Sequence, residues 1–183
     1  KRIFYNYKNS QELKFRNKEK LQETYKLKKS RKTPLLTLVS RFTEQKGLDL
    51  LIYVMDDLLK KDVQLIVHGN GDKHYEDTLR SFEEKYPDNY RLIQGFKEDT
   101  ARKIYAGGDL FLMPSLFEPC GTSQMIALNY GNIPLVREVG GLKDTIIPYN
   151  EFTGEGNGFS FRNYNGEELL NVIEYALDVF EDS

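Results

Sequence analysis

The chain lacks most of the features that mark disulfide-rich, metal-binding or membrane proteins. Its 183 residues include one cysteine, Cys120, and two histidines, His68 and His74, which cannot form a disulfide framework or a convincing zinc site. No apolar run approaches the ~18 residues that span a bilayer, and no apolar segment of a signal peptide follows the basic amino terminus. We therefore expect a soluble intracellular protein that contacts no membrane and needs no metal.

An excess of charge of either sign is also missing. Lys and Arg number 26 against 28 Asp and Glu, which gives a net charge of −2. This balance supplies no general electrostatic attraction to nucleic acids or acidic membranes. Cys120 has no histidine on its own loop, so a thiol nucleophile is not expected either.

The first 33 residues differ in composition from the rest of the chain. They lack an initiator Met, are rich in lysine and contain one predicted helix over residues 10–27. We interpret residues 1–33 as a basic leader at the junction of a fragment, and we expect the whole chain to be a piece of something longer. Residues 34–183 are long enough for one domain with a sizeable core.

Short apolar runs alternate with longer amphipathic stretches after Pro34. Such alternation requires crossover connections, which build a parallel sheet covered by helices on both faces. The sequence therefore predicts an α/β fold with a doubly wound, Rossmann-like parallel sheet. The predicted strands lie near residues 34–42, 62–68, 89–96, 109–115, 132–138 and 156–161.

Two cations follow the first predicted strand. Arg41 and Lys46 are five positions apart in a loop, and together they could neutralise a diphosphate. This position is favourable because ligands of open parallel sheets collect at the carboxyl ends of the strands. The alternative is that both side chains merely solvate the loop.

The ends of the next two strands carry weaker signals. Gly69 and Gly71 form half of a dinucleotide-binding fingerprint, but a turn alone could explain them. Phe96 could stack on a base, although an aromatic residue at a strand end is more often part of the core.

The strongest candidate is the stretch SLFEPCGTSQMIAL, residues 115–128. Thr122 or Ser123 is a natural N-cap, so the start of the following helix could receive a phosphate. Glu118 could then bind sugar hydroxyls or stabilise positive charge on a reacting carbon. Alternatively, Glu118 only pairs with Arg41 or Lys46 in the empty site.

Four blocks of residues 34–161 resemble the carboxyl-terminal half of bacterial glycogen synthases and plant starch synthases. The blocks are SRFTEQKGLDLL, GNGDKHYED, the long segment from IYAGGDLF through EPCGTSQ to GGLKDT, and NGFSF. The resemblance implies the second domain of a twin-Rossmann (GT-B type) glycosyltransferase. The family moves glucose from ADP-glucose or UDP-glucose to the non-reducing end of an α-1,4-glucan with retention of configuration, without a metal or other cofactor. A bacterial protein of this kind would be cytoplasmic and a plant one plastidial.

Carried over by motif, Arg41, Lys46 and Glu118 would be catalytic, the two cations on the donor diphosphate and Glu118 on the transferred glucose. Phe96 would stack on adenine. The predicted substrate-binding set is Phe96, Cys120, Gly121, Thr122, Ser123, Gly69 and Gly71. Two positions depart from the pattern: the family commonly reads E-P-C-G-L-T where this chain has Thr122 and Ser123. Ile126 stands where related transferases often carry a second Glu.

The resemblance also shows what is missing. A K-x-G-G-L loop and a histidine of the family's first domain are absent from this chain. We therefore expect the amino-terminal domain of the same parent to be a required partner, and the isolated chain to be inactive. Alternatives are a related retaining glycosyltransferase with a UDP-sugar and another acceptor, or a non-catalytic nucleotide-binding module. A nicotinamide oxidoreductase is disfavoured because the G-x-G-x-x-G fingerprint is absent.

Overall fold

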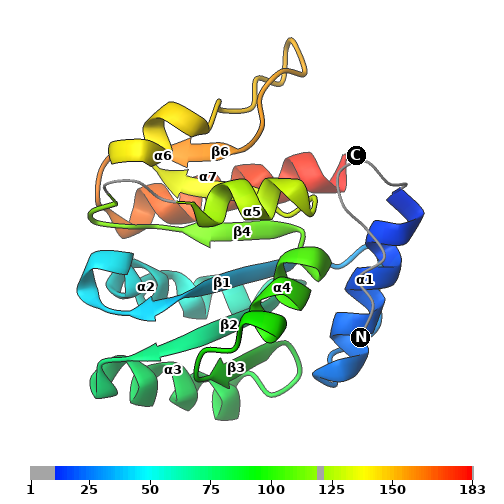
Figure 1. Ribbon diagram of the computed structural model, residues 1–183, viewed down its shortest axis with the longest axis vertical. Coiled ribbons are helices and arrows are strands. Elements are labelled where there is room, and N and C mark those ends of the chain that lie inside the picture. Colours follow the sequence, from blue (N-terminus) through cyan, green and yellow to red (C-terminus); the bar gives the residue numbers. More distant parts are fainter. Residues whose placement is uncertain (1–10, 119–121, 183) are drawn as a thin grey trace.

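The computed structural model describes residues 11–118 and 122–182 of the chain (Figure 1). Its centre is a six-stranded sheet in the order β3-β2-β1-β4-β5-β6, and every neighbouring pair of strands is parallel. The predicted doubly wound α/β fold is therefore confirmed, with the strand order of a Rossmann fold. The strands are β1 (Leu35–Phe42), β2 (Gln64–Gly71), β3 (Tyr90–Gln94), β4 (Leu110–Met113), β5 (Ile133–Arg137) and β6 (Phe159–Phe161).

Helices cover both faces of the sheet. One apolar cluster joins the sheet to α2, α3 and α7, and a second joins the opposite face to α1, α4, α5 and α6. Alternate residues of the strands serve the two clusters, as Leu36 and Leu38 against Leu35 and Val39 show for β1. The helices are α1 (Gln11–Thr24), α2 (Leu48–Leu59), α3 (Lys73–Lys85), α4 (Glu98–Gly107), α5 (Ser123–Asn129), α6 (Gly140–Thr145) and α7 (Gly166–Glu181), with a 3₁₀ turn, η1 (Glu44–Lys46), before α2.

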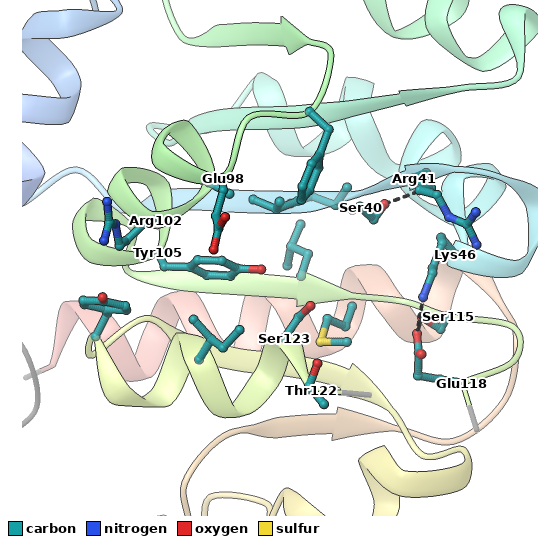
Figure 2. A pocket seen from close by; sticks show the side chains of 18 residues that line it. Ser40, Arg41, Lys46, Glu98, Arg102, Tyr105, Ser115, Glu118, Thr122 and Ser123 are labelled. Carbon is teal, nitrogen blue, oxygen red and sulfur yellow. Dashed lines mark hydrogen bonds and ion pairs between the residues drawn. The ribbon is translucent and has the colours of Figure 1, made fainter. Parts of the chain in front are cut away.

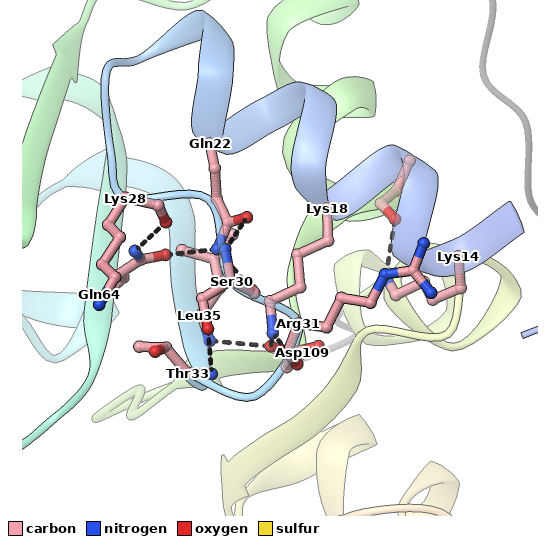
Figure 3. A network of polar contacts seen from close by, with 11 residues as sticks. Lys14, Lys18, Gln22, Lys28, Ser30, Arg31, Thr33, Leu35, Gln64 and Asp109 are labelled. Atoms are coloured by element: carbon pink, nitrogen blue, oxygen red, sulfur yellow. Dashed lines mark hydrogen bonds and ion pairs between the residues drawn. The ribbon is translucent and has the colours of Figure 1, made fainter. Parts of the chain in front are cut away.

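Helix α1 lies in the segment interpreted as a basic leader, and it packs on the sheet domain against α4. The side chains it buries are largely polar (Figure 3). Lys18 is fully buried, and its Nζ lies 2.8 Å from Oδ2 of Asp109, which also accepts a hydrogen bond from the Leu35 amide. Gln22 Nε2 donates to Gln64 Oε1 at 2.8 Å. Residues of the leader thus complete the polar contacts at the amino-terminal ends of β1, β2 and β4.

The interpretation of Gly69 and Gly71 as a turn was wrong. Gly69 and Gly71 belong to β2 rather than to a turn, and a Cβ on Gly69 would lie 1.8 Å from the Ser40 carbonyl oxygen. These glycines let β2 approach β1.

Candidate nucleotide-sugar site

A cavity of about 640 Å³ opens at the carboxyl ends of β1 and β4 (Figure 2). The strand order reverses between these two strands, and this switch point is where open α/β sheets bind ligands. Figure 2 shows Arg41, Lys46 and Glu118 toward one end of the cavity and Glu98 and Arg102 toward the other. Its lining comprises Leu38, Val39, Ser40, Arg41, Lys46, Phe96, Glu98, Ala101, Arg102, Tyr105, Leu112, Met113, Ser115, Glu118, Thr122, Ser123, Ile126 and Tyr130.

The end of β1 and the β1–α2 loop supply the two cations. Helix α2 begins at Leu48, directly after Gly47, which adopts a left-handed conformation (φ 80°) between η1 and α2. Lys46 therefore ends a 3₁₀ turn at the cavity and does not enter the helix. Arg41 is exposed at the end of β1, and no ion pair to it is found in residues 11–118 and 122–182.

Two loops far apart in sequence meet at Gly47. A Cβ on this residue would lie 2.0 Å from the Pro114 carbonyl oxygen, so only glycine permits the approach. The Gln45 carbonyl accepts hydrogen bonds from the amides of Leu116 (3.0 Å) and Phe117 (3.4 Å). This contact brings the loop after β4 alongside η1.

Arg137, the last residue of β5, holds the same loop from its other side. Its Nη1 donates to the carbonyl oxygens of Leu116 (2.9 Å) and Ser115 (3.3 Å). The guanidinium also lies 5.5 Å from the centroid of the Tyr164 ring. The segment that leads to Glu118 is thus fixed by groups on both sides.

Glu118 and Lys46 form the central contact of the site. Lys46 Nζ lies 2.8 Å from Glu118 Oε2, and Ser115 Oγ donates to the same oxygen at 3.3 Å. The Glu118 carboxylate is buried, whereas the Lys46 side chain retains 23% exposure. A pairing of Glu118 with Lys46 is therefore confirmed, and so is the convergence of residues 41, 46 and 118 on one cavity.

Aromatic rings form another part of the lining, from Phe96, Tyr105 and Tyr130. Phe96 is 62% exposed, so its interpretation as a core residue was wrong. Tyr105 is buried, and this burial raises the pKa of its phenol, while a hydrogen bond with Ser123 opposes the rise. The cavity thus combines apolar ring surface with cations and a carboxylate.

The start of α5 only partly matches its prediction. Thr122 occupies the N-cap position and Ser123 opens the helix, but the Thr122 side chain makes no capping hydrogen bond. Its carbonyl accepts from the amides of Met125 and Ile126 instead. Both Thr122 and Ser123 line the cavity, while Cys120 and Gly121 lie outside the described residues.

Gly69 and Gly71 do not line the cavity. Their predicted contact with substrate has no support in the geometry, because β2 extends through both residues and packs against β1.

Several lining residues were missed by the sequence analysis. Glu98, Arg102 and Tyr105 come from α4, and Ile126 and Tyr130 from α5 and its end. These residues lie on or at the ends of helices, whereas the predicted site residues lie close to the ends of strands. The i, i+4 spacing from Glu98 to Arg102 placed both on one side of α4, which was the available signal.

The described residues contain no cluster of three or more His, Cys, Asp or Glu side chains that could hold a metal. Among the helices of the same residues, none is long and apolar enough to cross a membrane.

Comparisons with known proteins agree on one family for this chain. The profile of the family described as glycosyl transferases group 1 matches residues 19–180. The glycogen synthase of Clostridium beijerinckii is 55% identical over 174 residues, and that of Desulfitobacterium hafniense is 53% identical over 166. These matches cover 95% and 91% of this chain and, in both cases, 36% of the relative. The chain thus spans little more than a third of the length of these relatives.

Among solved structures, the catalytic domain of starch synthase IV from Arabidopsis thaliana, bound to ADP and acarbose, matches with a TM-score of 0.89. It is 31% identical, and the match covers 98% of this chain and 38% of that chain. The carboxyl-terminal domain of a group 1 glycosyl transferase from Francisella tularensis shares the fold, with a TM-score of 0.71 at 16% identity over 96% of this chain and 86% of that one. The chain therefore belongs to the group 1 glycosyl transferases, as a Rossmann-like domain of the GT-B type that corresponds to the carboxyl-terminal domain of glycogen and starch synthases.

Proposed function

We propose that this chain is the donor-binding half of a retaining glucosyltransferase that moves glucose from ADP-glucose to the non-reducing end of an α-1,4-glucan. The observation that carries the proposal is the convergence of Arg41, Lys46 and Glu118 on one cavity whose lining also includes exposed aromatic surface. The volume of about 640 Å³ lies within the range of ~300–1,000 Å³ that small-molecule sites usually have. The glycogen synthase relatives and the ADP-bound starch synthase support the choice of donor.

The two cations would hold the donor diphosphate. The Arg41 guanidinium can make forked hydrogen bonds to phosphate oxygens, and Lys46 acts as a compact positive charge. Both would stabilise the negative charge that develops on the leaving nucleotide as the glucosyl bond breaks. Because these cations and the amides at the start of α5 can supply the stabilisation, we propose a reaction without a metal cofactor, so a chelator should leave the rate unchanged.

Glu118 would act on the sugar. Lys46 Nζ lies 2.8 Å from Oε2 of Glu118, so an incoming diphosphate would compete with Glu118 for the ammonium group. Once Lys46 turns to the phosphate, the carboxylate is free to accept hydrogen bonds from glucose hydroxyls and to stabilise positive charge on the reacting carbon. Phosphate binding and carboxylate release would thus occur together.

The binding site for the glucan acceptor and the remaining catalytic groups would be supplied by a preceding domain of the same parent. The chain spans little more than a third of the length of these relatives. We infer that the isolated chain binds ADP weakly and transfers no glucose. The relatives are bacterial, which favours the bacterial cytoplasm over a plastid.

A chimera tests the proposal. The matching segment of the Clostridium beijerinckii glycogen synthase is replaced by this chain, and glucose transfer to glycogen is measured with ADP-glucose and UDP-glucose. We expect transfer with a preference for ADP-glucose, and a loss of at least ~100-fold on Glu118→Ala. A folded chimera that keeps its rate after Glu118→Ala would refute the role of Glu118. A preference for UDP-glucose would mean that UDP-glucose, and not ADP-glucose, is the donor. Glucan elongation by the isolated chain would contradict the need for a partner domain.

A further inference from the structure

Phe96 presents a large apolar surface to the cavity. It follows Gly95, whose left-handed conformation (φ 100°) turns the chain between β3 and α4, and its side chain is 62% exposed. An exposed ring on a short loop needs a device that fixes its orientation, because a mobile ring loses conformational entropy when a ligand stacks on it.

His68 is placed to be that device. It lies on β2, is 1% exposed, and its ring is stacked on Phe96 with an interplanar angle of 11° and a centroid separation of 6.0 Å. A histidine buried this completely in a parallel sheet needs polar partners for its ring nitrogens, because burying an unpaired polar group is costly.

Both ring nitrogens of His68 bond to the backbone on either side of the β3–α4 loop. Nδ1 lies 2.7 Å from the Ile93 carbonyl oxygen, and Nε2 accepts the amide of Lys97 at 3.3 Å. An amide can only donate, so Nε2 carries no proton and Nδ1–H donates to Ile93. The His68 side chain therefore links residue 93 to residue 97. Phe96, whose ring lines the cavity, lies between these two residues.

The backbone adds a third tie. The Gly95 amide donates to the Gly69 carbonyl oxygen at 2.9 Å, directly after His68. The loop is thus anchored to β2 by two side-chain bonds and one main-chain bond. Only the side-chain bonds depend on the identity of residue 68.

We propose that His68 is a positioning residue for nucleobase recognition: it holds the β3–α4 loop so that the Phe96 ring is ready to stack on the base of a nucleoside diphosphate. The inference rests on the proposed function, because it assigns the aromatic part of the lining to the base. Catalysis and phosphate binding do not require His68, since Arg41 lies on β1 and Lys46 and Glu118 lie in the loops that follow β1 and β4, whereas the His68 ring bonds to the β3–α4 loop.

The test compares ADP with inorganic pyrophosphate, which shares the phosphates but has no base. NMR titrations of the whole chain measure both affinities into the millimolar range. His68→Leu keeps the volume and removes both ring hydrogen bonds, and His68→Gln restores one donor and one acceptor. Val67→Ala, at the adjacent and oppositely facing core position of β2, is the control for loss of stability alone.

We expect His68→Leu to weaken ADP about 5- to 10-fold without changing pyrophosphate, because stacking on an aromatic side chain supplies that order of affinity. His68→Gln should fall between His68→Leu and the wild type, and Val67→Ala should change neither affinity. In a Phe96→Ala background the His68→Leu change should have no further effect on ADP, because His68 acts through Phe96.

Other outcomes overturn the inference. The inference is refuted if both His68 variants leave the ratio of ADP to pyrophosphate affinity unchanged, whether or not they weaken both ligands equally. It is also refuted if His68→Leu has its full effect in the Phe96→Ala background. Either result would leave the proposed function standing. Absence of ADP and pyrophosphate binding to the wild-type chain would refute the proposed function itself.

Discussion

Two lysine–carboxylate pairs flank β4, and each has an Nζ–O distance of 2.8 Å. Lys18, on α1, and Asp109 lie at the amino-terminal end of β4 (Figure 3). Lys46 and Glu118 lie beyond the carboxyl end of β4, at the cavity (Figure 2). The pairs have the same chemistry but different surroundings. Lys18 is completely buried, while Lys46 keeps 23% of its side-chain exposure.

The partners of each pair explain the difference. The Lys18–Asp109 pair is closed by the Leu35 amide, the Arg31 carbonyl and the neighbouring Lys14, so a ligand has no access to it. The Lys46–Glu118 pair receives a hydrogen bond from Ser115 Oγ and faces the cavity. An enclosed pair contributes to folding, whereas an open pair is available for exchange with a ligand.

The largest expected effect separates the two pairs by stability. Lys18→Met leaves Asp109 buried without its main counter-charge and should lower the free energy of unfolding by about 3–5 kcal/mol. Lys46→Met should cost about 1 kcal/mol or less, because water can reach the remaining carboxylate through the cavity. Urea unfolding of both variants at pH 7 measures the difference, and equal costs would contradict the distinction between the pairs.

The open pair also depends on the loop contact at Gly47. Gly47→Ala should lower the free energy of unfolding by roughly 2–3 kcal/mol, because the left-handed backbone is strained and the Cβ meets the Pro114 carbonyl. Gly154→Ala is the matched control: Gly154 has a similar φ of 72°, but its Cβ would meet nothing within 4 Å, so only the backbone strain of about 1 kcal/mol remains. If both substitutions cost the same, the close approach of the two loops does not hold the site together.

The enclosed region should also make stability depend on pH. Burial lowers the pKa of Lys14 from 10.5 to about 7, and Lys18 and Asp109 are the charged groups that act on it. Between pH 7 and 10.5 the unfolded chain therefore binds a proton that the folded chain does not, so the free energy of unfolding rises with pH in this range. Lys14→Met should reduce the rise between pH 7 and 9 by roughly 1–2 kcal/mol in urea unfolding. Parallel curves for the two proteins would show that Lys14 keeps its charge when buried.

The smallest effect concerns the exchange proposed for the open pair. Glu118→Gln removes the charge that competes with phosphate for Lys46, so pyrophosphate should bind about 5-fold more tightly than to the wild-type chain, a change of about 1 kcal/mol. Glu167→Gln, whose carboxylate accepts from Tyr53 outside the cavity, is the control and should change nothing. Unchanged or weaker binding to Glu118→Gln would mean that Glu118 does not restrain Lys46.

The sequence was sufficient for the sheet and for the charged part of the site. Buried strands such as Leu35–Phe42 are almost continuously apolar, and the residues that follow them must lie at one edge of a parallel sheet. Arg41, Lys46 and Glu118 could therefore be placed together without coordinates.

Contacts that depend on tertiary structure could not be predicted in this way. From composition, residues 1–33 were interpreted as a basic leader. The sequence does not distinguish Lys18, which pairs with the distant Asp109, from a surface lysine. The ion pair of Lys46 with Glu118 depends on Gly47 meeting Pro114, and the role of His68 depends on carbonyl and amide groups of another strand and loop. Such pairings follow from the geometry of the fold rather than from local patterns.

The central claim is that the open pair separates when a nucleoside diphosphate occupies the cavity. A crystal structure of the chain soaked with ADP at millimolar concentration tests it directly. The account predicts phosphate oxygens within hydrogen-bond distance of Arg41 and Lys46, the base against Phe96, and Lys46 Nζ moved away from the Glu118 carboxylate. ADP bound at another place, or in the cavity with the 2.8 Å contact of Lys46 and Glu118 intact, would contradict it.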